Sequence, residues 1–385
     1  MVNKILFIGF DDFSHINSSV IEQLTRHFSD FQIKKVWLKP QLKKQKLTLA
    51  VAFGAMLWEL GDDFLRGVKS WKNWRNHYYS TGYMIHKLSE IADAETKKDS
   101  YAFTFQTQSL FKCPGGRFGN FIYTDHTNLN NLNYRLIRPN EYLASKNFRL
   151  KEQEIYENAT TVFVMSENIR RSLIEQYGIS SEKACLVYAG ANSGEPVKTI
   201  SEKFKSKNIV FVGKDWERKG GPLLMEAFQK VRKKIPEATL TIIGCNPVTH
   251  KEGCHIMGTV PKSEVIKAFQ QATVFCLPTR REPFGMVFIE AMFNKLPVVC
   301  TSVGATPDLI EDGRNGFLIS FQSDALAEKL CLLLENPKLA EQFAEEGFNK
   351  VNILYTWENV GNRMSSVIRK QMSAFTVSNG EQIKN

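Results

Sequence analysis

The sequence predicts an α/β protein with two domains, each built around a parallel β-sheet. At 385 residues the chain is long enough for two separate hydrophobic cores. Short apolar runs ending in glycine, such as Asn3–Gly9 and Asn208–Gly213, are followed by segments with apolar residues at helical spacing. Such runs are typical of strands buried on both faces of a parallel sheet and joined by crossover helices. The pattern occurs in both halves of the chain, which predicts two Rossmann-like domains.

In the first half, strands are expected at 3–9, 32–38, 101–106, 121–123, 161–165 and 183–188. Helices are expected at 14–28, 150–159 and 167–177. Ser166 precedes the last of these helices, and its hydroxyl is suited to accept a hydrogen bond from a free N–H of the first turn. No Gly-x-Gly-x-x-Gly motif follows the first strand, so a dinucleotide cofactor is not indicated. Residues 193–207, rich in Ser, Gly, Pro and Lys, are predicted to link the two domains.

In the second half, strands are expected at 208–213, 239–244, 255–260, 272–278 and 298–301, with a turn and an edge strand over 312–319. A helix is expected from Pro222, because proline suits the first position of a helix. Further helices are expected at 323–335 and 337–350, and a last one begins near Tyr355 and ends near 374. Residues 375–385 are predicted to form a loose tail.

Residues 42–79 form an unusual stretch. Lysines at 43, 44 and 46 open it, and an apolar stripe at steps of three and four begins with Phe53, Leu57 and Leu60. Glu59 belongs to the opposite, charged side. One interpretation is a helix, or two, packed on the N-terminal sheet. The other is an interfacial helix or a wall of an acceptor site that touches lipid head groups. Glycines at 54, 61 and 67 predict that the helix breaks.

The net charge of +10 is concentrated in one part of the chain. Residues 34–149 hold 19 basic and 9 acidic residues, a surplus of 10. This surplus indicates either a solvated basic face or contact with an anionic partner such as a membrane surface, a phosphorylated acceptor or a nucleic acid. No motif that reads RNA or DNA is present, so nucleic acid is not the expected partner.

The cysteines and the hydropathy pattern predict where the protein resides. Seven cysteines are scattered without a Cys-x-x-Cys pair, which argues for reduced thiols and against a structural zinc. Lys4 precedes only a short apolar run, so no secretory signal is expected, and no run approaches the roughly 18 apolar residues of a membrane span. We therefore expect a cytoplasmic protein, either free or peripheral at the inner face of the membrane.

Two carboxylates stand at a predicted strand-to-helix corner in the second half. Glu282 follows the apolar run 272–278, and Glu290 lies about two turns into the next helix. In an open α/β sheet, ligands bind at the carboxyl ends of the strands, where this corner lies. Carboxylates at such a place can accept hydrogen bonds from the vicinal hydroxyls of a sugar.

The start of the same helix is suited to an anion. The N–H groups of Gly285, Met286 and Val287 are expected to lack partners within the helix and to attract a phosphate. Gly285 has no side chain, so a ligand can approach its backbone closely. One end of the ligand would be a phosphate and the other a polyol, a combination that describes a nucleotide sugar.

A basic loop follows the first strand of the second domain. Lys214 and Lys219 flank this corner, and Arg218 is a competing candidate. Two cations on a loop that opens a helix suit a diphosphate and the charge that develops when it departs. The alternative is a solvated basic loop.

The run from Pro278 to Met292, with its two glutamates eight residues apart, resembles the donor-binding signature of retaining GT-B glycosyltransferases of the GT4-like group, the glycosyl transferases group 1. The resemblance covers most of residues 118–370. It implies two Rossmann-like domains that face each other across a cleft, with a C-terminal helix that crosses back to the N-terminal domain. The implied boundaries are 1–195 for the acceptor domain, 208–355 for the donor domain, 356–374 for the returning helix and 375–385 for the tail.

The resemblance also implies roles on the donor side. Glu290 would bind the ribose hydroxyls, and Glu282 would hold the sugar together with the backbone that follows Phe284, at Gly285, Met286 and Val287. Lys214, which stands where the family commonly has arginine, and Lys219 would stabilise the departing diphosphate. Residues 255–260 resemble the segment whose backbone brackets the nucleotide base, which assigns Gly258 and Val260 to the donor site.

On the N-terminal side, Thr124-Asp125-His126-Thr127 resembles the strand-end motif whose histidine lies beside the transferred sugar and the acceptor. His126 is therefore expected to be catalytic, with Asp125 near the acceptor. The loop after the first strand lies over the cleft in this family. It is assigned Gly9 on the donor side and Asp12 on the acceptor side.

The predicted function is retaining transfer of a hexose from a nucleotide sugar to an unidentified acceptor by front-side displacement, with no cofactor and no metal. UDP-glucose is the favoured donor because such donors are frequent in the family. The acceptor is expected to be lipid-linked or a natural product. Two alternatives stay open: a nucleotide-sugar epimerase of the same fold, and a non-catalytic basic protein that binds membranes or nucleic acid.

Overall fold

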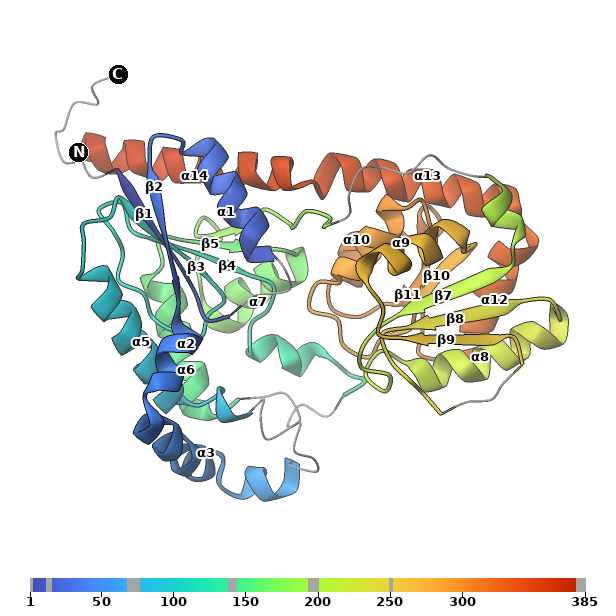
Figure 1. Ribbon diagram of the computed structural model, residues 1–385, viewed down its shortest axis with the longest axis horizontal. Coiled ribbons are helices and arrows are strands. Elements are labelled where there is room, and N and C mark those ends of the chain that lie inside the picture. Colours follow the sequence, from blue (N-terminus) through green and yellow to red (C-terminus); the bar gives the residue numbers. More distant parts are fainter. Residues whose placement is uncertain are drawn as a thin grey trace. The chain divides into compact units, whose positions relative to one another are not determined.

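The computed structural model describes residues 3–11, 16–67, 77–137, 144–192, 201–248 and 252–378, with the side chains of residues 46 and 62–67 excepted. The chain forms two compact units (Figure 1). Unit 1 comprises Met1–Tyr188 and Trp357–Asn385, and unit 2 comprises Ala189–Thr356.

Unit 1 contains a six-stranded sheet in the order β2-β1-β3-β4-β5-β6, and all of its pairings are parallel. The strands are β1 (Lys4–Gly9), β2 (Gln32–Trp37), β3 (Phe103–Thr107), β4 (Asn120–Thr124), β5 (Thr161–Val164) and β6 (Ala184–Leu186). Stacked rings of Phe7, Phe105, Phe163 and Phe121 run across four of the strands and form the centre of the core. The predicted parallel sheet is confirmed.

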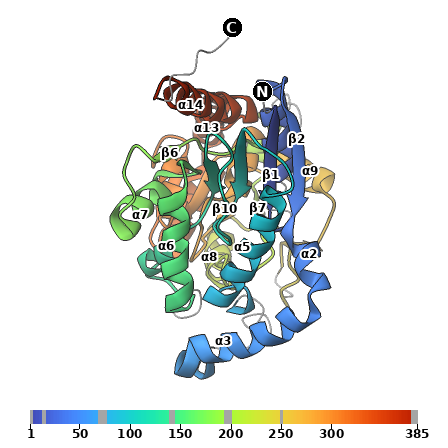
Figure 2. The ribbon, with the colours of Figure 1, turned by 90° about the vertical axis from the view of Figure 1, so that its left-hand side faces the viewer.

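The helices of unit 1 cover both faces of this sheet (Figure 2). They are α1 (Ile16–His27), α2 (Leu38–Lys44), α3 (Lys46–Gly67), α5 (Gly82–Thr96), α6 (Lys146–Asn158), α7 (Glu167–Tyr177) and α14 (Trp357–Ser378), with a 3₁₀ turn at Leu129–Asn133. The predicted cap of α7 is confirmed, because the Ser166 hydroxyl accepts a hydrogen bond from the Ile169 N–H at 3.3 Å.

The C-terminal helix α14 packs in unit 1, against α1. Arg26 pairs with Glu358 at 3.1 Å, and the rings of Phe118 and Phe375 meet at 5.6 Å. The helix continues to Ser378, so the predicted tail is wrong for residues 375–378. The remaining tail residues, 379–385, lie outside the described part of the chain.

Helix α3 is rotated relative to the interpretation in which its apolar stripe packs on the N-terminal sheet. Phe53 and Leu57, which would then face the core, are each 40% exposed, whereas Ala52 and Met56 are fully buried. Glu59, expected on the solvent side, points inward and accepts hydrogen bonds from the start of α5. The predicted break is confirmed at Gly61, whose φ of 49° and ψ of −132° interrupt the helix.

Unit 2 contains a second six-stranded sheet in the order β12-β11-β10-β7-β8-β9, also parallel throughout. Its strands are β7 (Asn208–Val212), β8 (Thr239–Ile243), β9 (Cys254–Gly258), β10 (Val274–Leu277), β11 (Val298–Thr301) and β12 (Gly316–Ile319). Its helices are α8 (Gly221–Lys234), α9 (Lys262–Gln271), α10 (Met286–Phe293), α11 (Thr306–Leu309), α12 (Ser323–Glu335) and α13 (Pro337–Leu354). The second predicted Rossmann-like sheet is therefore confirmed.

Part of the expected linker 193–207 belongs to the core of unit 2. A 3₁₀ helix at Ser201–Lys205 buries Phe204 and Lys203, and the Lys203 ammonium donates to the carbonyl oxygen of Asn294 at 2.8 Å. Burial, with a smaller effect from the charge of Lys295, lowers the pKa of Lys203 to about 8. This packing could not be predicted from the sequence, because a lysine-rich segment is normally solvated.

This buried lysine predicts a pH-dependent stability. Its pKa is about 8 in the folded state and 10.5 for the ordinary group, so between these values the unfolded state holds more protons and the free energy of unfolding rises with pH. From about pH 8 to pH 10, wild type should gain about 2 kcal/mol relative to Lys203→Met in urea unfolding. The exposed neighbour Lys205 serves as the control: Lys205→Met should follow the wild-type pH profile. Parallel profiles for wild type and Lys203→Met would contradict the lowered pKa.

Candidate active site

The order of strands in unit 2 reverses between β7 and β10. From β7 the chain adds β8 and β9 on one side, and then β10, β11 and β12 on the other. In an open parallel sheet, loops that leave the strands at such a reversal separate and create a ligand-binding crevice at the carboxyl edge. The loops that follow β7 and β10 are the two that carry the predicted diphosphate and sugar contacts.

A buried ion pair joins these two loops. The ammonium of Lys219, after β7, pairs with the carboxylate of Glu282, after β10, and both side chains are nearly buried, at 11% and 7% exposure. Burial lowers the pKa of Lys219, while the charge of Glu282 opposes this effect. The structure thus brings together two of the residues that the sequence assigned to the donor site.

Backbone contacts fix the two loops against each other. A side chain at Gly220, whose φ is 77°, would place its Cβ 1.8 Å from the carbonyl oxygen of Pro278, so the close approach requires glycine. The Arg218 guanidinium donates to the carbonyl oxygen of Arg281 at 2.9 Å, and the Arg280 N–H donates to that of Arg218 at 2.8 Å. Arg218 therefore has a role in holding the loops together.

Helix α10 begins where the sequence predicted. Gly285 precedes it with a φ of 99°, and a Cβ there would lie 2.5 Å from the Phe288 ring. Met286 and Val287 form the first turn, so their N–H groups have no acceptor within the helix. The buried ring of Phe284 lies 6.4 Å from that of Tyr355, which holds the loop against the end of α13.

Glu290 lies half-buried on α10 with a cation beside it. The Lys262 ammonium, at the start of α9, is 3.4 Å from the Glu290 carboxylate and also donates to the carbonyl oxygen of Asn192. Sequence reasoning missed Lys262, because a lysine in the first turn of an ordinary helix carries no distinguishing signal.

The remaining donor-side predictions lie on loops at the same edge of the sheet. Gly258 ends β9 with a φ of 64°, and its carbonyl oxygen accepts from the Gly244 N–H at 2.7 Å. Val260 is half-buried just before α9, and Lys214 is exposed on the loop after β7. These positions agree with the carboxyl edge on which the predictions were based, but no contact joins them to the Lys219–Glu282 pair.

In unit 1, His126 lies on the loop after β4. Its carbonyl oxygen accepts a hydrogen bond from the Thr124 hydroxyl at 2.8 Å, and its Nε2 lies 3.2 Å from the side-chain nitrogen of Asn131. Asp125 is half-buried beside it. Gly9 ends β1, where a Cβ would lie 2.7 Å from the Trp37 ring, so packing alone accounts for glycine there. Asp12 lies outside the described residues.

A buried carboxylate that sequence reasoning missed supports the His126 loop. Glu152, 2% exposed on α6, accepts hydrogen bonds from the hydroxyls of Tyr177, Tyr156 and Ser109 and from the Asn128 N–H. Burial raises its pKa, and the hydrogen bonds oppose that shift. The sequence signal that could have indicated its burial is its position on the same face of α6 as the buried residues Phe148 and Ile155.

Three comparisons place this chain among known proteins. Residues 198–350 match the family model described as "Glycosyl transferases group 1". Over these residues the chain is similar to the group 1 glycosyltransferases. It is similar to a D-inositol 3-phosphate glycosyltransferase of Corynebacterium aurimucosum, with 23% identity over 58% of this chain and 60% of that protein. It is also similar to a phosphatidyl-myo-inositol mannosyltransferase of Mycobacterium tuberculosis, with 31% identity over 42% of this chain and 47% of that protein. The chain thus spans about half to three fifths of the length of these relatives.

The fold also resembles that of a solved structure. The structure of Anabaena HepE, determined with UDP and glucose, superposes with a TM-score of 0.60 and 14% identity over 95% of this chain and 99% of that one. Together with the two parallel sheets, this likeness confirms the predicted GT-B fold.

The ion pair between the two loops leads to a prediction about stability. Lys219→Met or Glu282→Gln alone leaves a buried charge without its partner, so each should lower the free energy of unfolding by about 3 kcal/mol. The double variant should lose at least ~1 kcal/mol less than the sum of the two. Urea unfolding of the four proteins measures this coupling.

The exposed pair Lys234–Glu335 of the same unit, 2.6 Å apart, is the matched control. The equivalent cycle there should give a coupling below about 1 kcal/mol. Additive effects at Lys219 and Glu282 would show that the buried pair does not form in solution.

Proposed function

We propose that this protein is a retaining glycosyltransferase that moves a hexose from a nucleotide sugar to an anionic acceptor. The observation that carries the proposal is the Lys219–Glu282 pair at the point where the strand order of unit 2 reverses. This pair supplies a cation for the diphosphate and a carboxylate for the sugar hydroxyls within one crevice. The match of residues 198–350 to the group 1 glycosyltransferases supports the same function.

In the proposed donor complex, the diphosphate lies at the start of α10 and shares the Lys219 ammonium with Glu282. Exposed Lys214 adds a second cation from the same loop, and Glu290 accepts from the ribose hydroxyls. Gly258 and Val260 border the base. A UDP-hexose is the proposed donor, supported by the likeness to HepE, whose structure holds UDP and glucose.

The proposed chemistry is front-side displacement. The acceptor oxygen attacks the anomeric carbon on the face from which the diphosphate leaves. As the bond between that carbon and the phosphate oxygen breaks, this oxygen takes the acceptor proton. Lys219 and Lys214 stabilise the charge that develops on the leaving group, and His126 positions the sugar and the acceptor. Because two lysines can supply this charge, we propose that transfer needs no divalent metal.

We propose an acceptor that carries a phosphate and is lipid-linked, presented at a membrane surface. The curated relatives are named for D-inositol 3-phosphate and for phosphatidyl-myo-inositol. The surplus of 10 positive charges in residues 34–149, within unit 1, suits such an acceptor.

The first test is a thermal-shift screen of the full chain against UDP, GDP, ADP and their hexose derivatives. A nucleotide at 100 times its dissociation constant should stabilise the protein by ~2.7 kcal/mol. Radiolabelled UDP-glucose is then offered with phosphatidylinositol or inositol phosphate, in excess EDTA. We expect transfer under these conditions; stabilisation by none of the nucleotides would overturn the proposal.

Glu282→Gln separates transfer from nucleotide binding. This variant should keep the stabilisation by UDP and lose transfer about a hundredfold or more, because the sugar is no longer held. Glu345→Gln, which removes an exposed carboxylate of the same unit, should transfer at the wild-type rate. A Glu282→Gln protein with normal turnover would contradict the role of Glu282.

A further inference from the structure

The outward side of α3 is apolar over four helical turns. Its large apolar side chains are Leu47, Val51, Phe53, Leu57 and Trp58, exposed by 79%, 46%, 40%, 40% and 80%. Between residues 47 and 61, every exposed position is apolar or glycine: Leu47, Ala50, Val51, Phe53, Gly54, Leu57, Trp58 and Gly61. We call this set the α3 face. A soluble helix normally places charged residues on its outward side.

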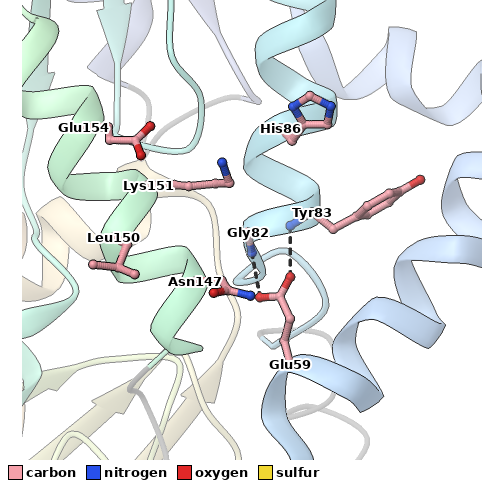
Figure 3. A pocket seen from close by; sticks show the side chains of 8 residues that line it. All are labelled: Glu59, Gly82, Tyr83, His86, Asn147, Leu150, Lys151 and Glu154. Atoms are coloured by element: carbon pink, nitrogen blue, oxygen red, sulfur yellow. Dashed lines mark hydrogen bonds between the residues drawn. The ribbon is translucent and has the colours of Figure 1, made fainter.

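The opposite side of α3 is fixed to unit 1, which sets the rotation of the helix. The Glu59 carboxylate accepts from the N–H groups of Gly82 and Tyr83 at 2.8 and 3.1 Å and so caps α5 (Figure 3). It also accepts from the hydroxyl of Ser145, the residue that caps α6. The Tyr78 hydroxyl donates to the Leu49 carbonyl at 2.8 Å. The α3 face cannot turn inward without breaking these bonds.

A pocket lies on the inward side of α3, beside Glu59. This pocket of about 400 Å³ opens between α3, α5 and α6, and Leu150, 51% exposed, lies on its border (Figure 3). Lys151 lines the same pocket, so one cation stands next to this apolar border, together with the carboxylate of Glu154.

Positively charged residues are concentrated just before the start of α3. Lys43 and Lys44 are exposed at the end of α2, directly before α3. Residues 34–50 hold six lysines and no acidic residue. The only carboxylate among the described side chains of α3 is Glu59, which points inward. Over residues 47–61, this apolar face with cations before it and no outward acid among the described side chains complements a surface of anionic head groups over acyl chains.

We propose that α3 is a membrane-docking element, which lies in the plane of an anionic bilayer with the α3 face among the upper acyl chains and Lys43 and Lys44 at the head groups. No helix in the described part of the chain is long and apolar enough to span a bilayer. Docking requires only the folded unit 1, so it goes beyond the transferase function and does not depend on it.

Co-sedimentation of the full chain with vesicles tests the proposal. Wild type should bind vesicles that mix phosphatidylglycerol with phosphatidylcholine, and bind pure phosphatidylcholine at least tenfold more weakly. Leu57→Gln/Trp58→Gln should weaken binding to the mixed vesicles at least tenfold, with an unchanged melting temperature because both side chains are exposed. Lys43→Gln/Lys44→Gln should reduce the preference for phosphatidylglycerol.

Leu332→Gln/Val377→Gln replaces two exposed apolar residues of other helices and is the matched control, which should bind as wild type does. Fluorescence of Trp58, taken as the difference between wild type and Trp58→Phe, should shift to the blue on the mixed vesicles. Two results would overturn the proposal. One is equal binding by wild type and the α3 variant. The other is a dimer in sedimentation equilibrium that the α3 variant dissociates, without vesicle binding, which would assign the α3 face to a second copy of the chain.

Discussion

The buried ion pair of Lys219 and Glu282 is the interaction on which the proposed donor site depends. Two charges removed from water are tolerated only when each satisfies the other, so the pair holds the loops after β7 and β10 in one arrangement. The neighbouring contacts, from Arg218 to Arg281 and from Gly220 to Pro278, reinforce that arrangement through the backbone. The pair also holds the Lys219 ammonium in position before a diphosphate binds. Binding therefore requires less reorganisation of the site.

A second buried carboxylate has a comparable role in unit 1. The Glu152 carboxylate accepts hydrogen bonds from α6, α7, the loop after β3 and the loop that carries His126. It therefore joins segments that are distant in the sequence. A loop held in this way keeps a fixed backbone, which suits the positioning role proposed for His126. Glu59 performs a related task for α3, where one carboxylate caps α5 and binds the residue that caps α6. In both cases one acidic side chain organises helices and loops, and the apolar residues around it supply the packing.

The structural features that could be predicted from the sequence are those that depend on short-range residue patterns and on the topology of parallel sheets. Apolar runs located the strands, and the helix start at Gly285 and the Ser166 cap followed from local chemistry. Lys219 and Glu282 could be assigned to one site because both follow strands that end at the same edge. Their direct pairing could not be predicted, since it depends on the loop conformation. The sequence left the orientation of α3 open because its apolar residues cover more than one face. The side that turns inward is set by Glu59, which accepts hydrogen bonds at the starts of the distant helices α5 and α6. Glu152 and Lys203 were missed because charged residues are expected in solvent.

The most direct test of the donor site is the contribution of the second phosphate to binding. Calorimetric titration of the full chain with UDP and with UMP gives this contribution as the ratio of two dissociation constants. If Lys219 holds the diphosphate, UDP should bind wild type at least about tenfold more tightly than UMP, a difference of ~1.4 kcal/mol. Lys219→Met should lose most of this preference, because only Lys214 and the start of α10 then remain to bind the second phosphate. A preference for UDP that survives intact in Lys219→Met would contradict the site described.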